Sequence, residues 1–210
     1  MSRWTKQGGF PISPFLSNLR SSSNLKLDME PPSWPARFSR LRQLFWLFFL
    51  LTIAYMIWVR NYLSPLSSDE LVQFEIAKTA NNAQTIIEEW KSSGKYELGV
   101  QSTYFAYIFM VLYTVAIALG CRFISACTGN EILIKGGKGF SWLIVCAMAC
   151  DLVENIALSR TIRGHIYQWN VTLAYNLARV KFSIVIVCVL FMLSCFLYWG
   201  IGKLAGGKKL

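Results

Sequence analysis

Four long apolar stretches stand out along the chain, separated by segments that carry most of its polar residues. The first runs without a charge between Arg42 and Arg60, and the last runs without one from Phe182 to Gly202. About 20 apolar residues in a helix cross a hydrocarbon core of roughly 30 Å. Because the stretches lack the period-two alternation of strands, their backbone can satisfy its hydrogen bonds in a bilayer only as helices. We therefore predict an all-α membrane protein with four transmembrane helices, at about 43–61, 99–121, 139–158 and 181–202.

The segment between the first two spans has the pattern of a short helical hairpin, at about 67–94. Ser67 followed by Glu70 forms a capping box that opens a helix, and Thr79 is placed to cap a second helix that ends near Gly94. Apolar side chains recur on one face of each helix, namely Leu71, Phe74 and Ala77 in the first and Ala83, Ile86, Ile87 and Trp90 in the second. We expect these faces to be buried against each other or against the mouth of the bundle, on the outer side of the membrane.

Two further connections join the later spans. The run Lys135–Gly139, KGGKG, predicts a tight basic turn into the third span. The connection at 159–181 holds Tyr167, Trp169 and Tyr175, and aromatic residues of this kind favour the interface between water and lipid. We therefore predict a segment that lies in the interface before the fourth span.

The ends of the chain are polar and basic. Residues 1–42 are rich in serine, proline and arginine, which predicts a disordered cytoplasmic tail, and 203–210 form a second basic tail. The composition of 1–35 also matches an organelle transit peptide. The amphipathic helix of such a peptide is missing, so a plain tail is the favoured interpretation.

The net charge of +10 would suggest nucleic-acid binding in a soluble protein, but 54% of the residues are hydrophobic and only 15% are charged. The excess positive charge lies in the two tails and in the connection between the second and third spans, where it orients membrane proteins and attracts anionic lipid. We therefore predict no nucleic-acid partner, both termini in the cytoplasm, and a plasma or inner membrane if the source is bacterial. Basic residues at 160–181 oppose this orientation locally, and the two tails outweigh them.

Little else in the sequence indicates chemistry. Four of the six cysteines fall inside predicted spans, where they serve as small packing residues, and no CxxC pair accompanies the single histidine, His165. We predict no metal, no cofactor and no catalytic residues. Asn170 begins a glycosylation sequon that faces outward in the predicted topology.

One polar cluster lies inside the third span. Asp151, Glu154 and Asn155 occupy positions i, i+3 and i+4, which places them on one helix face. A charged side chain in the hydrocarbon costs at least about 2.5 kcal/mol, so each acid must be paired, protonated or in contact with water. The candidate partners are two bases that open the fourth span and two tyrosines at the outer end of the second, namely Arg179, Lys181, Tyr104 and Tyr107.

Two interpretations of this cluster remain open. It is either an ion-pair and hydrogen-bond network that fixes the register of the helices, or a path for protons or cations or a polar substrate pocket. Two acids and two bases can neutralise one another, and this balance favours the structural network.

Three sequence features resemble a group of small, uncharacterised four-span membrane proteins found mainly in bacteria. They are FEIAKT at 74–79, Trp90 before the second span, and DLVEN at 151–155 in the third span. In that group an FExAxT segment follows the first span and a DxxEN motif lies in the third, and the resemblance covers about residues 44–199. It implies the four-span architecture, and it implies that the acidic cluster works together with the hairpin residues Phe74, Glu75, Thr79 and Trp90.

Three functions are compatible with these features. A non-enzymatic binding, scaffolding or assembly protein, with a protein partner or a second copy of itself, fits the small size and the lack of catalytic motifs. A small oligomeric transporter would use Asp151 and Glu154, but helices broken by proline or glycine, which such machines use, are missing from the pattern. A lipid enzyme is the third alternative, and the sequence offers it no recognisable nucleophile or base.

Overall fold

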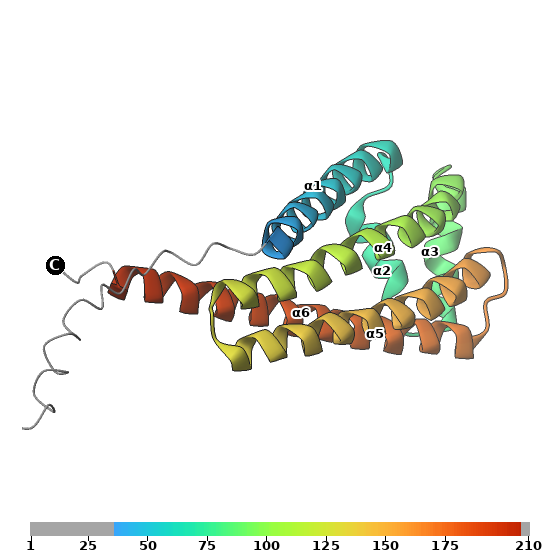
Figure 1. The fold of residues 1–210 in the computed structure, drawn as a ribbon. Coiled ribbons are helices and arrows are strands. Elements are labelled where there is room, and N and C mark those ends of the chain that lie inside the picture. Colours follow the sequence, from blue (N-terminus) through green and yellow to red (C-terminus); the bar gives the residue numbers. More distant parts are fainter. Residues whose placement is uncertain (1–35, 207–210) are drawn as a thin grey trace, which may run out of the picture. The chain divides into compact units, whose positions relative to one another are not determined.

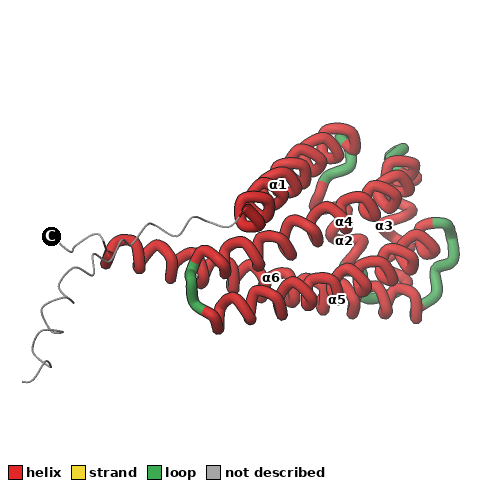
Figure 2. The backbone as a smooth tube through the Cα atoms, in the orientation of Figure 1, coloured by secondary structure: helices red, strands yellow, loops and turns green. Residues whose placement is uncertain are grey.

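The computed structural model describes residues 36–206, with side chains at 39–204. This part of the chain forms six helices and no strand: α1 (Ala36–Leu63), α2 (Ser68–Glu75), α3 (Ala80–Ser92), α4 (Tyr96–Cys127), α5 (Glu131–Ile162) and α6 (Gln168–Gly206) (Figures 1 and 2). The predicted fold class, four long helices with a short helical hairpin between the first two, is confirmed.

Four helices are long and apolar enough to cross a membrane, at Ser39–Leu63, Tyr96–Cys127, Glu131–Ile162 and Gln168–Leu204. The protein is therefore a multi-pass membrane protein. Each helix is longer than the span predicted from the sequence, because the prediction followed the length of the apolar stretch. A charge sets the limit of the hydrocarbon region but does not end a helix, which continues into the interface.

The predicted turn at Lys135–Gly139 is wrong, because these residues lie inside α5. The chain turns at Thr128–Asn130 instead, where Gly129 has φ +66° and the Asn130 side chain accepts hydrogen bonds from the first turn of α5. Gly137 of this run lies where α5 packs against α4. A Cβ on Gly137 would lie 2.6 Å from the Cys121 carbonyl oxygen, so this glycine lets α5 approach α4 closely.

The bounds predicted for the connection at 159–181 are also wrong. A loop of five residues, 163–167, separates α5 from α6, and Gly164 in it has φ +99°. Tyr167, the last residue of this loop, and Trp169, in the first turn of α6, are exposed. Most of the segment 159–181 is therefore helical, because α5 continues to Ile162 and α6 already begins at Gln168.

The tails differ from the prediction where they are described. Residues 36–42 belong to α1 and residues 203–206 to α6, so the disorder predicted for 1–42 is wrong at 36–42, and the helix continues into the tail predicted at 203–210. Residues 1–35 and 207–210 lie outside the described part of the chain.

The helices α4, α5 and α6 pack against one another, and α1 packs along α4 (Figure 1). Two hydrogen bonds fix α4 and α5 as antiparallel neighbours: Tyr96 Oη donates to the Ile162 carbonyl at 3.0 Å, and Ser141 Oγ donates to the Ala118 carbonyl at 2.8 Å. The turn at Thr128–Asn130 therefore marks one end of the bundle. We call the other end, where α2 and α3 lie, the hairpin end.

The hairpin is folded onto the bundle. Its helices begin at the predicted caps: Glu70 N donates to Ser67 Oγ while Ser67 N donates to the Glu70 carboxylate, and Asn82 N donates to Thr79 Oγ1. Lys95 Nζ lies 2.8 Å from Glu70 Oε1, and these bonds lower the pKa of the Glu70 carboxyl. The predicted apolar faces form one cluster with the ends of α5 and α6, made of Phe74, Ala77, Ala83, Ile87, Trp90, Ala157, Leu158, Ile162, Val171 and Ala174 among others.

Candidate functional site

One ammonium group faces three carboxylates at the hairpin end. Lys181 of α6 places its Nζ 3.0 Å from Asp151 Oδ1 and 2.9 Å from Glu154 Oε2, both on α5. The same Nζ lies 4.0 Å from Glu75 Oε2, at the last residue of α2. Asp151, Glu154 and Lys181 are buried, and Glu154 is 0% exposed. We call Glu75, Asp151, Glu154 and Lys181 the acid cluster.

Neighbouring side chains hold Asp151 in place. Tyr113 Oη of α4 donates to Asp151 Oδ2 at 2.7 Å, and Asn155 Nδ2 donates to Asp151 Oδ1 at 2.9 Å. The second bond follows from the i, i+4 spacing on α5. Both oxygens of Asp151 are therefore occupied, whereas among the described residues Glu154 is bonded through Lys181 alone.

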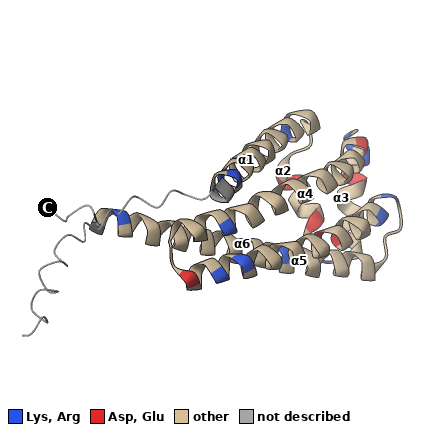
Figure 3. Ribbon diagram, viewed as in Figure 1, with Lys and Arg blue, Asp and Glu red and all other residues tan. Residues whose placement is uncertain are grey.

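The cluster is not electrically balanced. Three carboxyl groups share one ammonium group, so the set has more acids than bases in a region of low dielectric. Figure 3 shows that acidic residues gather toward the hairpin end of the bundle. Glu75 lies outside the spans, and burial raises the pKa of its carboxyl above the ordinary value.

Three of the four predicted partners do not join the cluster. Arg179 is exposed, and its guanidinium lies over the ring of Tyr175 at 5.6 Å. Tyr104 is exposed as well and accepts a hydrogen bond from Arg163 of the loop after α5. Tyr107 is half-buried and makes no hydrogen bond to the acids. Tyr113, which was not predicted from the sequence, is the tyrosine that donates a hydrogen bond to Asp151.

The structure does bring Glu75 to the intramembrane acids, and the resemblance of the FEIAKT and DLVEN segments pointed to such an association. The other hairpin residues have structural positions. Phe74 and Trp90 are buried, with ring centroids 5.2 Å apart, and Thr79 caps α3. Trp90 also covers Gly99, where a Cβ would lie 2.6 Å from the indole ring.

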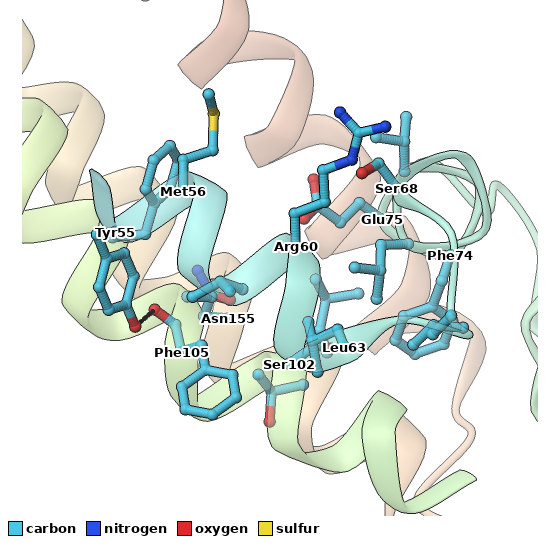
Figure 4. A pocket seen from close by; sticks show the side chains of 18 of the residues that line it. Tyr55, Met56, Arg60, Leu63, Ser68, Phe74, Glu75, Ser102, Phe105 and Asn155 are labelled. Carbon is cyan, nitrogen blue, oxygen red and sulfur yellow. Dashed lines mark hydrogen bonds between the residues drawn. The ribbon is translucent and has the colours of Figure 1, made fainter. Parts of the chain in front are cut away.

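An apolar cavity of about 470 Å³ lies beside the acid cluster. It is bounded by the last two turns of α1, by α2 and by the first half of α4, and Asn155 and Leu158 of α5 contribute to its wall. In Figure 4, Arg60, Ser68 and Glu75 lie together at one side of this space, while Tyr55, Met56 and Phe105 line another side. Tyr55 Oη is bonded to the Phe105 carbonyl at 3.0 Å, which joins α1 to α4 next to the cavity. No pattern in the sequence predicted this cavity.

No known protein family model, curated protein or solved structure matches the chain. The function must therefore be argued from the geometry of the site.

The sequon at Asn170 is not available for glycosylation in the folded protein. Asn170 is 0% exposed, at the start of α6, and its Nδ2 donates to the His165 carbonyl at 3.1 Å. The asparagine side chain closes the loop between α5 and α6 rather than pointing to solvent.

Lys181 Nζ occupies the position between Asp151 and Glu154 that a cation would take. Within residues 36–206, no group of three histidine, cysteine or acidic side chains is placed to hold a metal ion. His165 is exposed in the loop, apart from the cavity lining.

Proposed function

We propose that this protein is a non-enzymatic, membrane-embedded binding protein that holds an amphipathic molecule in the cavity between α1, α2 and α4. The cavity itself carries the proposal. Its volume of about 470 Å³ lies within the range of small-molecule sites. Its wall is mostly apolar, with a few polar side chains gathered at one side, and such a lining suits a molecule with an apolar chain and a polar head.

The position of the cavity suggests that its occupant comes from the bilayer. The cavity lies where α1 and α4 border each other within their membrane-spanning parts, and the exposed side chains Met56 and Ile57 of α1 line it. An amphiphile in the membrane could pass between these helices without crossing water. The capped and packed hairpin holds α2 in place before any ligand arrives, which reduces the entropy lost on binding.

We further propose the cytoplasmic location of both termini, with the hairpin end outside, in a plasma or inner membrane if the source is bacterial. Arg40 and Arg42 of α1 and Lys203 of α6 would then meet anionic lipid at the cytoplasmic face. A protein partner or a second copy of the chain on the apolar faces of α1 and α6 is part of the same proposal, and nucleic acid is not.

A small transporter is the second candidate, and one observation favours it. Three carboxylates share Lys181, so an acid without its own base is present, as a proton or cation carrier requires. Against it, α4, α5 and α6 run as unbroken helices, which offer no hinge for alternating access. Binding therefore remains the function that the geometry supports better.

The first prediction tests the cavity. The protein is purified from native membranes in mild detergent, and co-purified small molecules are counted per chain by native mass spectrometry. Ala106→Trp places a large ring into the cavity wall, and Val111→Trp places the same ring on the exposed face of α4, away from it. We expect Ala106→Trp to reduce the bound molecule at least tenfold and Val111→Trp to leave it unchanged.

Ser102→Phe serves as a second filling variant, because Ser102 lines the cavity and its hydroxyl bonds only within α4. Thermal unfolding of each variant shows whether it is folded. A bound molecule that persists in both folded filling variants, or the absence of any bound molecule in the parent, contradicts the binding function. A stoichiometric protein partner that is lost with the filling variants would instead assign the cavity to assembly.

A further inference from the structure

We infer that the molecule bound in the cavity carries a cationic amine head group, and that Glu75 receives it. This inference rests on the proposed binding function and names the chemical class of the ligand. It follows from three observations, which concern the exposure of Glu75, its missing partners and the charge around the cavity.

Glu75 is the acid of the cluster that a ligand can reach. It lines the cavity, and its side chain keeps 30% of its exposure, whereas the side chains of Asp151 and Glu154 keep 7% and 0%. The two acids of α5 are buried, Lys181 bonds to both of them, and Asn155 bonds to Asp151. A head group that enters the cavity therefore meets the carboxylate of α2 first.

Glu75 is also the acid whose bonding is incomplete. Within residues 36–206 no side chain or backbone donor makes a hydrogen bond to its carboxylate, and its only cation within 4.0 Å is Lys181 Nζ, at that distance. Lys181 is already engaged at 3.0 Å or less by Asp151 and Glu154. A carboxylate at the edge of a low-dielectric site gains most from a donor that is itself charged.

The balance of acids and bases around the cavity favours a cationic ligand. Three acids, Glu75, Asp151 and Glu154, stand against two bases, Arg60 at the cavity wall and Lys181. An amine head group supplies a third base, whereas a carboxylate or phosphate head group would add another acid. A primary amine also supplies the hydrogen-bond donors that Glu75 lacks.

The second prediction tests this with three probes of one chain length: hexadecylamine, hexadecanol and hexadecanoate. Full-length protein in micelles of a neutral sugar detergent at pH 7.5 is freed of its native occupant, and one-to-one adducts are titrated by native mass spectrometry. We expect the amine to bind at least tenfold more tightly than the alcohol and the carboxylate. Glu75→Gln should remove this preference by weakening the binding of the amine.

Glu89→Gln is the matched control, because Glu89 is an exposed carboxylate of α3 outside the cavity lining. It should keep the preference for the amine. Equal binding of all three probes, abolished by Ala106→Trp, would overturn the amine assignment and leave the binding function intact. Tighter binding of the carboxylate, or an amine preference that survives Glu75→Gln, would also overturn the assignment. No binding of any probe would count against both proposals.

Discussion

Lys181 reaches the acids of α5 while Arg179 does not, and helix geometry explains the difference. Residues two apart on a helix point about 200° away from each other, so only one of the two bases can face α5. The spacing of Asp151, Glu154 and Asn155 was enough to predict that the three share a face. The hydrogen bond from Tyr113 to Asp151 could not be predicted from the sequence. Which tyrosine of α4 reaches Asp151 depends on the rotation of α4 about its axis and on the direction of the side chain, which points toward the N-terminus of its helix.

At the scale of single residues, the third prediction concerns the base of the acid cluster. Lys181→Met leaves three carboxylates without their ammonium group, and we expect a loss of roughly 3–5 kcal/mol in stability, as for other broken buried pairs. Arg179→Met, two positions away and exposed, should change stability by about 0.5 kcal/mol or less. The measurement is unfolding in detergent for both variants under the same conditions.

A double-mutant cycle measures the coupling between Lys181 and the acids directly, so the test does not depend on the stability of a single variant. Asp151→Asn combined with Lys181→Met should be less destabilised than the sum of the two single variants, because the second change removes a charge that the first left unpaired. Coupling near zero for Lys181 with Asp151 and with Glu154 would contradict the ion-pair account. The transporter would then become the stronger candidate.

At the scale of elements, the sequence predicted the existence of every helix and the caps of α2 and α3, but not where the long helices begin. Caps are local, since Ser67 and Thr79 bond to amides three residues away. The ends of α5 and α6 depend on packing. The glycines at 136, 137 and 139 resemble a turn by composition, yet they lie in a helix, and Gly137 lets this helix approach α4 closely.

The fourth prediction compares two of these glycines. A Cβ on Gly137 would lie 2.6 Å from the Cys121 carbonyl oxygen and 2.8 Å from Ser125 Cβ, whereas a Cβ on Gly139 meets nothing within 4 Å. Gly137→Ala should therefore destabilise the protein by about 1–3 kcal/mol through overpacking. Gly139→Ala should stabilise it by up to about 1 kcal/mol, because alanine favours the helix. Thermal unfolding checks both, and equal effects of the two changes would speak against the packing of α5 on α4.

At the scale of the whole molecule, the four crossings followed from length and apolarity, and the cavity did not follow from any local pattern. Its volume depends on the position of α1 relative to α4 and on where the hairpin holds α2. Both are set by contacts far apart in sequence, such as that of Tyr55 with the Phe105 carbonyl. The joining of Glu75 to Asp151 and Glu154 is of the same kind, since it requires α2 to fold back over the bundle.

The last prediction concerns orientation. The hairpin and the Thr128–Asn130 turn lie at opposite ends of the bundle, so they must be on opposite sides of the membrane. The basic flanks of α1 and α6 favour the turn inside. Arg160 and Arg163 at the hairpin end oppose this, but each lies over an aromatic ring, and Lys181 is neutralised by acids.

An impermeant thiol reagent added to intact cells should therefore label Ser92→Cys in α3 and leave Glu131→Cys unlabelled until the cells are opened. Both positions are exposed, and the background carries alanine at the six native cysteines, three of which are buried. The reverse pattern would mean that the protein is inverted, with its cavity open to the inner leaflet. Labelling of both positions from outside would mean that the chain does not cross the bilayer as four spans.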